Sequence, residues 1–365
     1  MRSSVLAAAC VLLSHVPPAG AAAMSVTADV APATSRADVF PRAPVDFPDG
    51  VVATPDVEYA NLTGFRPLVL DLYREARGAA RHARPLVIYV HGGGWRRGDS
   101  RTTGAFANFP RVLASLAARG YVVASINYRL SGEARYPAAV RDVNSAITYL
   151  RAHAGQWGID PARIVLWGDS AGAYLAAMSA TTCNDPRFAP PLSTGRMSRR
   201  EAAAASAPRV SDCVQAVVCW YGLFDLGRLA AGNSRSIVDD VQEFLGCARG
   251  SCGALARRAS PLTHVSRRTP PMLLMHGTAD TEVPSGQTVE MAAALRAAHV
   301  PVQLQLIAGA NHGWIAHNAA ATRRASLAAL RRTFEFIDGM TANPGRAITT
   351  RPGGRPSRAG TTPRS

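Results

Sequence analysis

The strongest chemical motif in the sequence is a serine between glycines, Gly168-Asp169-Ser170-Ala171-Gly172. The apolar run Ile164–Trp167 precedes it, and a helical pattern, Ala171–Thr181, follows it. A G-x-S-x-G motif between a strand and a helix is typical of a sharp turn that exposes the serine hydroxyl. The glycines allow close packing there, and a helix N-terminus favours negative charge. An incidental serine in a glycine-rich turn is the alternative, but the setting favours Ser170 as a nucleophile.

A serine hydroxyl is a weak nucleophile until a base takes its proton, and two later segments supply a base and an acid. His312 follows the apolar run Val302–Ile307, and Asp280 follows the run Met272–Met275. Each of the three residues therefore comes after a different predicted strand, at the edge where open α/β sheets build their sites. We predict that His312 is the base and that Asp280 orients its imidazole.

A second glycine motif, His91-Gly92-Gly93-Gly94-Trp95, follows the apolar run Leu86–Val90. Glycines allow the backbone to approach a ligand and to direct N–H groups into a site. In a hydrolase such donors face the oxygen that becomes negative in the reaction. A phosphate-binding loop is the alternative, but no Gly-Lys-Ser/Thr follows and no G-x-G-x-x-G pattern with a later acid is completed.

Other polar residues compete for roles near these motifs. We expect Asp169 to orient the turn at Ser170, and Glu282 is the one substitute for Asp280. His317 is expected to lie outside the site. No H-E-x-x-H or similar spacing occurs, so no metal and no cofactor are predicted. Structural roles are expected for the remaining candidates, which are His91, His276, Arg141 and Asp142.

Short apolar runs alternate with helical patterns along most of the chain. Most of the runs are continuous, which is typical of strands covered on both faces. The alternation predicts an α/β fold with a mostly parallel, doubly wound sheet. The predicted strands are Leu68–Tyr73, Leu86–Val90, Val122–Asn127, Ile164–Trp167, Val214–Trp220, Met272–Met275 and Val302–Ile307. The predicted helices are Phe109–Arg119, Ala138–Ala154, Ala171–Thr181, Ser285–His299 and Thr322–Gly339.

The domain organisation follows from the same patterns. We expect a signal peptide over residues 1–23, a loose lead-in over 24–50 and one catalytic domain over 51–340. Helical patterns without a strand fill about 225–270, so a helical cap is predicted there, between late strands. Residues 341–365 form an Arg-rich tail with few apolar residues, which predicts disorder.

The N-terminus predicts secretion or a periplasmic location. A basic start, Met1-Arg2, precedes the apolar stretch Val5–Val16, and Ala21-Ala22-Ala23 fits a cleavage site. Two alternatives stay open: Met24 as the start of a cytosolic protein, and a poor lipoprotein site at Cys10. No other stretch reaches the roughly 18 apolar residues of a transmembrane helix, so none is predicted.

Cleavage would leave five cysteines, which suit an oxidising compartment. Cys247 and Cys252 lie close enough for a tight disulfide loop, with Gly250 between them. Cys183 and Cys213 flank an exposed excursion, and a bridge there would stabilise the fold by about 3–4 kcal/mol. Cys219 lies inside an apolar run and is expected to be a buried free thiol.

Composition limits the function classes. The 365 residues are 47% hydrophobic and 18% charged, which is typical of a globular protein and excludes collagen, a coiled coil and a disulfide-dense mini-protein. The formal net charge is +15, yet every one of the 40 basic residues is Arg. Composition bias explains an absence of Lys better than selection for phosphate binding does, so no specific nucleic acid is expected.

Taken together, these motifs resemble the α/β-hydrolase superfamily. They look like its secreted carboxylesterase branch, similar to hormone-sensitive-lipase and bacterial feruloyl- and acetyl-esterase-like domains, over roughly Asp56 to Gly339. The motifs that carry the resemblance are His91–Trp95, Ser125–Leu130 and Gly168–Gly172, with Asp280 and His312, in the chain order serine, acid, histidine.

The resemblance implies a cofactor-free serine esterase that acts on a small-molecule ester through an acyl-enzyme. It also implies an oxyanion hole made by the amides of Gly93, Gly94 and Ala171. Under the cap, Trp95, Tyr174 and Trp314 are candidates for substrate contact, as are Trp220 and Tyr221. No oligomeric state is predicted.

Two other functions remain open at this point. A serine exopeptidase could use the same residue order, although only about 60 mature residues precede the glycine loop, too few for a propeller domain. A non-catalytic binding protein that kept the hydrolase fold is the third hypothesis, because fold alone never proves activity.

Overall fold

A computed structural model describes residues 43–76, 82–192, 210–231, 235–248 and 251–342. The predicted signal peptide, most of the predicted lead-in and all but the first two residues of the predicted tail lie outside these ranges.

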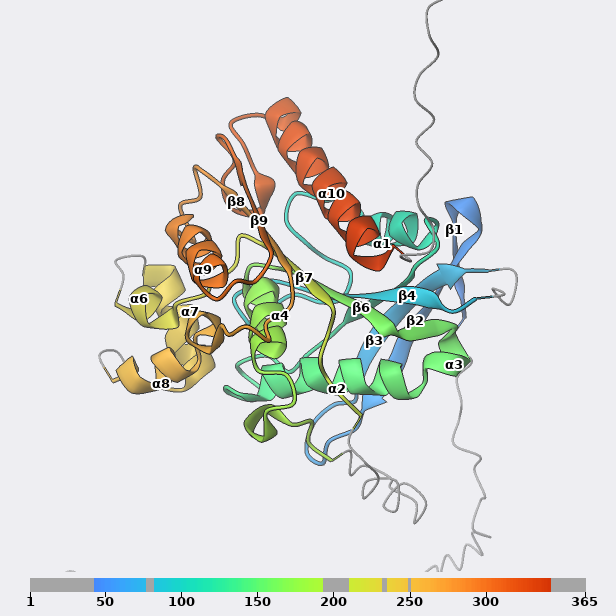
Figure 1. The fold of residues 1–365 in the computed structure, drawn as a ribbon, viewed down its shortest axis with the longest axis horizontal. Coiled ribbons are helices and arrows are strands. Elements are labelled where there is room, and N and C mark those ends of the chain that lie inside the picture. The colour runs from blue at the N-terminus through green and yellow to red at the C-terminus, as the bar shows by residue number, and fades with distance from the viewer. Residues whose placement is uncertain (1–42, 77–81, 193–209, 232–234, 249–250, 343–365) are drawn as a thin grey trace, which may run out of the picture. The chain divides into compact units, whose positions relative to one another are not determined.

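A twisted sheet of nine strands forms the centre of the described chain (Figure 1). Its order is β1-β2-β3-β5-β4-β6-β7-β8-β9. The first three pairs in this order, β1 with β2, β2 with β3 and β3 with β5, are antiparallel. The remaining five pairs are parallel. The strands are β1 (Val45–Phe47), β2 (Val51–Ala60), β3 (Leu68–Glu75), β4 (Arg84–Val90), β5 (Val122–Ile126), β6 (Ile159–Asp169), β7 (Ala216–Trp220), β8 (Met272–Gly277) and β9 (Val302–Ile307).

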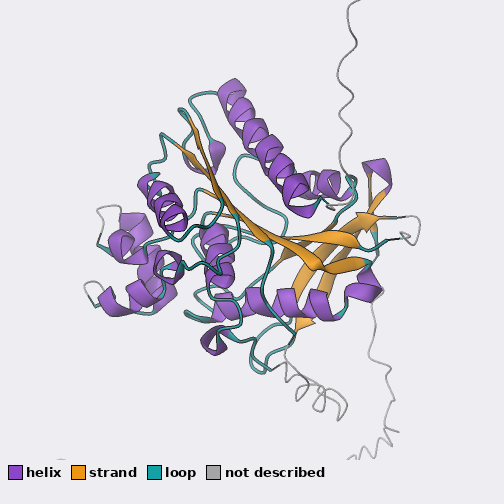
Figure 2. Cartoon of the chain, in the orientation of Figure 1, coloured by secondary structure: helices purple, strands orange, loops and turns teal. Residues whose placement is uncertain are grey.

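Helices cover both faces of the sheet (Figure 2). One face packs against α2 (Ala138–Ala152), α4 (Ala171–Thr181) and α9 (Gly286–Ala297), and the other against α1 (Phe109–Ala117) and α10 (Ala319–Thr341). The continuous apolar runs follow from this arrangement, because every residue of β5, β7 and β8 is buried. The predicted mostly parallel, doubly wound α/β architecture is confirmed.

The chain between β7 and β8 carries the cap. It contains α6 (Leu226–Ala230), α7 (Arg235–Leu245), α8 (Gly253–Arg258) and a short 3-10 turn, Pro261–His264. No strand occurs in the described part of this insertion, as the sequence suggests. Both predicted disulfides are present, Cys183–Cys213 and Cys247–Cys252, and Cys219 is a buried free thiol.

The two ends of the domain differ from the prediction. The prediction of a loose lead-in over 24–50 is wrong for Val45–Phe47, which form the strand β1. A strand of three residues is too short to show a periodic pattern. At the other end α10 continues to Thr341, one residue into the predicted tail. Thr341 is 5% exposed and its hydroxyl bonds Tyr121 OH at 2.9 Å, so it belongs to the folded domain.

A short helix, α3 (Ala154–Trp157), separates α2 from β6, where one continuous helix to Ala154 is expected from the sequence. Among the described residues, no helix is both long and apolar enough to cross a membrane.

Candidate active site

The turn between β6 and α4 holds Ser170 in a strained conformation. Its φ is 51° and its ψ −120°, in a region that non-glycine residues rarely adopt. A Cβ on Gly172 would overlap the carbonyl oxygen of Val90, and one on Gly168 would overlap that of Gly172. The glycines are therefore required by the close approach of β4, β6 and α4, which presents the serine at the end of the sheet.

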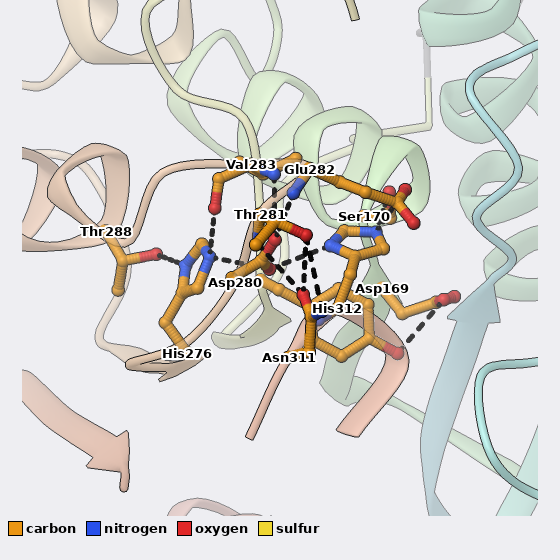
Figure 3. Close-up of polar contacts among 11 residues, drawn as sticks. Asp169, Ser170, His276, Asp280, Thr281, Glu282, Val283, Thr288, Asn311 and His312 are labelled. Carbon is orange, nitrogen blue, oxygen red and sulfur yellow. Dashed lines mark hydrogen bonds and ion pairs between the residues drawn. The ribbon is translucent and has the colours of Figure 1, made fainter. Parts of the chain in front are cut away.

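The structure brings Ser170, His312 and Asp280 together in a hydrogen-bonded chain (Figure 3). Ser170 Oγ lies 3.0 Å from His312 Nε2, and His312 Nδ1 lies 2.8 Å from Asp280 Oδ2. These bonds place the hydrogen of the neutral imidazole on Nδ1 and leave Nε2 free to accept the serine proton. As the sequence predicts, each residue follows the end of a different strand: Ser170 follows β6, Asp280 follows β8 and His312 follows β9.

The side chain of Asp280 is fully buried and accepts several hydrogen bonds. Its Oδ1 accepts the amides of Glu282 at 2.9 Å and Val283 at 2.8 Å, while Oδ2 faces His312 and also His276, 3.1 Å away. Burial raises the pKa of Asp280, but the hydrogen bonds from the two histidines outweigh burial and hold its pKa well below the usual range. The carboxylate is therefore ionised throughout the neutral range.

The pKa of His312 is raised above its ordinary value of 6.5. Burial lowers this pKa, but the hydrogen bond and charge of Asp280, with the charges of Glu282 and Asp169, outweigh burial. Tyr221, just after β7, packs against the imidazole, with the two ring centroids 4.6 Å apart. The site thus favours a positive charge on His312.

Asn311 positions the two loops of the site, a role that the sequence analysis did not predict. Its side-chain Oδ1 accepts the amide of His312 at 2.7 Å and that of Thr281 at 2.9 Å. One side chain therefore joins the loop that carries His312 to the loop that carries Asp280. An Asn directly before a turn residue is a recognised local signal for such a bond.

Asp169, beside the serine, is a buried carboxylate that does not contact His312 directly. It accepts from Tyr89 OH at 2.5 Å and from Tyr221 OH at 3.4 Å. Burial raises its pKa. A Cβ on Gly92 would lie 2.7 Å from its Oδ2, so Asp169 also packs against the glycine loop. It joins the serine turn to the glycine loop and to the tyrosine that packs on His312.

The glycine loop after β4 adopts left-handed backbone angles at three successive residues. The φ values are 107° at Gly93, 62° at Gly94 and 60° at Trp95. Gly93 accepts from the amides of Arg96 at 3.1 Å and Arg97 at 3.2 Å, which closes the turn. Gly92 lies against Ser170, since its Cβ would come 3.1 Å from Ser170 Cβ. The loop therefore borders the serine.

The cap helix α7 packs directly on this loop. Phe244 stacks on Trp95 with ring centroids 4.4 Å apart, and both rings contact Tyr174 of α4. Arg96 pairs with Asp240 and with Glu243, each at 3.0 Å. The cap, the glycine loop and the helix after Ser170 thus form one packed unit.

The residues predicted to contact substrate divide into two groups. Trp95 and Tyr174 lie beside the glycine loop and the cap, although both side chains are fully buried. Trp314 is also fully buried, and it packs against Trp220 and Tyr221 in the core on the α1 and α10 face. Its position makes Trp314 part of the packing beneath the loop of His312 and gives it no exposed face for a ligand.

The other candidates have structural positions. Glu282 is 69% exposed and lies 3.9 Å from His312 Nε2, on the serine side of the ring, so it does not replace Asp280. Burial lowers the pKa of His91 to about 4, and its ring stacks on Tyr128 at 4.3 Å. His317 is exposed. Asp142 forms a buried ion pair with Arg129, and Arg141 bonds the carbonyl of Arg187.

Within the described ranges, no group of three or more His, Cys, Asp or Glu side chains could hold a metal ion.

Comparison with protein families supports the resemblance. The BD-FAE family model matches residues 70–295. Esterase LipQ of Mycobacterium tuberculosis is 31% identical over 278 residues, which are 76% of this chain and 60% of LipQ. The chain thus spans less than two thirds of that relative's length.

Solved structures share the fold. A thermophilic esterase of Thermogutta terrifontis, Est2, matches with a TM-score of 0.59 and 26% identity, over 80% of this chain and 94% of that one. A truncated carbohydrate esterase from gut microbiota matches with a TM-score of 0.63 and 23% identity, over 81% of this chain and 98% of that one.

Proposed function

The chain belongs to the BD-FAE family, with an α/β-hydrolase fold, and on this basis we propose that it is a secreted serine carboxylesterase. It would hydrolyse carboxylic esters of small molecules through an acyl-enzyme intermediate. The likeness to esterases such as LipQ and Est2 supports the reaction class.

The observation that carries the proposal is the unbroken chain from Ser170 Oγ through His312 to Asp280, with contacts of 3.0 and 2.8 Å. As Ser170 attacks the ester carbonyl, His312 Nε2 takes the hydroxyl proton and becomes an imidazolium. The buried Asp280 carboxylate stabilises that charge and keeps the ring in the reactive tautomer. His312 then gives the proton to the departing alcohol, which leaves the acyl group on Ser170.

The carbonyl oxygen becomes negative during this attack, and backbone amides would stabilise it. We assign this role to the amides of Gly93, Gly94 and Ala171. Ala171 is the first residue of α4, so its N–H has no acceptor within the helix. The positive φ of Gly93 and Gly94 takes the loop out of the strand conformation, and the neighbouring Gly92 lies against Ser170.

Hydrolysis of the acyl-enzyme would repeat the chemistry with water. His312 removes a proton from a water molecule, and the resulting nucleophile attacks the acyl carbonyl. The same amides hold the oxyanion, and the proton returns to Ser170 as the acid product leaves. No group beyond these side chains and amides is needed for either half-reaction.

Secretion or a periplasmic location is part of the proposal. The two disulfides support it, because such bonds persist in oxidising compartments. The predicted signal peptide lies outside the described residues.

The proposed function is tested by measuring the turnover of nitrophenyl esters of increasing acyl length with the purified full chain. Ser170→Ala should lower turnover at least about 10⁴-fold, because no other group can form the acyl-enzyme. Ser115→Ala, on the exposed side of α1, is the matched control and should match the wild type. A fluorophosphonate probe should label the wild type and not Ser170→Ala.

Two outcomes would contradict the proposal. Equal ester turnover by the wild type and Ser170→Ala would exclude the serine mechanism. Faster cleavage of a dipeptidyl amide than of any ester would indicate an exopeptidase.

A further inference from the structure

One oxygen of Asp280 is shared by two imidazoles. Oδ2 lies 2.8 Å from His312 Nδ1 and 3.1 Å from Nε2 of His276, a fully buried residue near the end of β8 (Figure 3). The two rings approach the carboxylate from opposite sides in that view. The mechanism above uses only one of them.

The surroundings of His276 determine where its hydrogen lies. Nε2 faces two acceptors, Asp280 Oδ2 and the carbonyl oxygen of Val283, 2.9 Å away, so it must carry a hydrogen. Nδ1 faces the hydroxyl of Thr288 in α9 at 2.6 Å, and in the neutral ring, which carries one hydrogen, Nδ1 accepts from that hydroxyl. The network therefore assigns the neutral tautomer with hydrogen on Nε2.

We propose that His276 is a positioning residue of the triad, whose Nε2–H donates to the oxygen that also binds His312 and thereby limits how strongly Asp280 holds the catalytic histidine. This inference rests on the proposed function. Asp280 keeps its place without His276, because the amides of Glu282 and Val283 still hold Oδ1. What changes is the acceptor strength of Oδ2.

The direction in which the pKa of His312 would move follows from the sharing of Oδ2 between the two imidazoles. A carboxylate oxygen that accepts two hydrogen bonds has less negative charge available for each. Without the donor from His276, Asp280 would stabilise the imidazolium of His312 more strongly. The pKa of His312 would rise, and the acid limb of the rate profile would move to higher pH.

Other groups around the pair would be unchanged by this substitution. Glu282 lies 3.9 Å from His312 Nε2, and the buried Asp169 acts on the ring through its charge. Tyr221 packs on the imidazole, and Ser170 bonds Nε2. None of these four contacts passes through His276, so a shift of the acid limb would report on the shared oxygen.

Two substitutions at one position separate the donor from the rest of the side chain. His276→Gln places an amide N–H near the position of Nε2, where it still reaches Asp280. His276→Asn places its amide near the position of Nδ1, where it faces Thr288 and not Asp280. Both variants keep a polar group in the buried site, and thermal unfolding of each would check the fold.

The measurement is kcat/KM for a nitrophenyl ester between pH 5 and 9. His276→Asn should move the acid limb up by about 0.5–1 pH unit, as expected for one lost hydrogen bond, with the high-pH plateau within about threefold of wild type. His276→Gln should leave the limb near its original position.

Three results would overturn the inference: an unmoved limb in His276→Asn, a limb moved to lower pH, or an equal loss at every pH in both variants. A limb moved to lower pH would mean that His276 strengthens the hold of Asp280 on His312, and an equal loss at every pH would mean that His276 only holds the loop together. The pH dependence of fluorophosphonate labelling of Ser170 gives a second reading of the limb without ester turnover. Absence of wild-type turnover with normal labelling would therefore count against the proposed function alone.

Discussion

Replacing Asp280 with Asn tests the geometry of the site most directly. Oδ1 of Asp280 accepts two backbone amides, which cannot rotate away. The single carbonyl oxygen of Asn must therefore remain with these amides, and its NH₂ group must face the imidazoles of His312 and His276. His312 Nδ1 would then have to accept, so its hydrogen would move to Nε2, the atom that should take the proton of Ser170.

In this tautomer the imidazole of His312 keeps its place, but its Nε2 carries a hydrogen and cannot accept the proton of Ser170. Comparable changes in serine hydrolases lower kcat by about 10⁴-fold, which corresponds to about 5.4 kcal/mol of transition-state stabilisation. We expect a loss of this order for Asp280→Asn with little change in KM, because the side chain of Asp280 is fully buried behind His312.

The assay is steady-state hydrolysis of a short nitrophenyl ester at pH 8, with thermal unfolding as a check of the fold. Glu282→Gln is the matched control, because Glu282 is 69% exposed and lies on the opposite side of the imidazole, 3.9 Å from Nε2. It should change kcat less than about threefold, as expected for an exposed charge. Retention of a tenth of the activity by Asp280→Asn, or an equal loss in Glu282→Gln, would refute this reading of the triad.

Three further predictions follow from the described contacts. The acid limb of kcat/KM in the wild type should lie above pH 6.5, because the pKa of His312 is raised and its protonated form cannot accept the proton of Ser170; a pH profile that stays flat down to pH 6 would contradict this. Phe244→Ala should lower the free energy of unfolding by about 3–5 kcal/mol in a denaturant titration, because the ring is 1% exposed and stacks on Trp95; a loss below about 1 kcal/mol would show that the cap does not depend on this contact. Replacing Cys183 and Cys213 together by Ser should cost about 3–4 kcal/mol in the same titration, and the shorter Cys247–Cys252 loop less; the reverse order would contradict the loop-entropy argument.

The sequence by itself determined strands β3 to β9 and the order of the reactive residues, but not β1 and β2. Strands buried on both faces need continuous apolar runs, so the central strands were visible as local patterns. The serine turn was also visible, because close packing of β4, β6 and α4 excludes a Cβ at Gly168 and Gly172. The constraint on Gly172 comes from Val90 in β4, far along the chain, yet the sequence records it because only a glycine fits at that position.

The edge strand β1 and the C-terminal end of α10 could not be predicted from local sequence patterns. The strand β1 exists because it pairs with β2, and its three residues have no pattern of their own. The end of α10 depends on Thr341, which is held by the distant Tyr121. Where a distant partner decides a conformation without restricting the residue type, the sequence carries no local signal.

The tertiary structure alone decided which way several loop side chains point. Asp280 and Glu282 are two residues apart, yet one is buried against His312 Nδ1 and the other is exposed on the opposite side of the ring. Trp95 and Trp314 each follow a glycine of a site motif, but one packs against the cap and the other in the core of the far sheet face. The direction of a side chain in a loop depends on backbone angles and on what packs over it, and neither is a property of residue type or spacing.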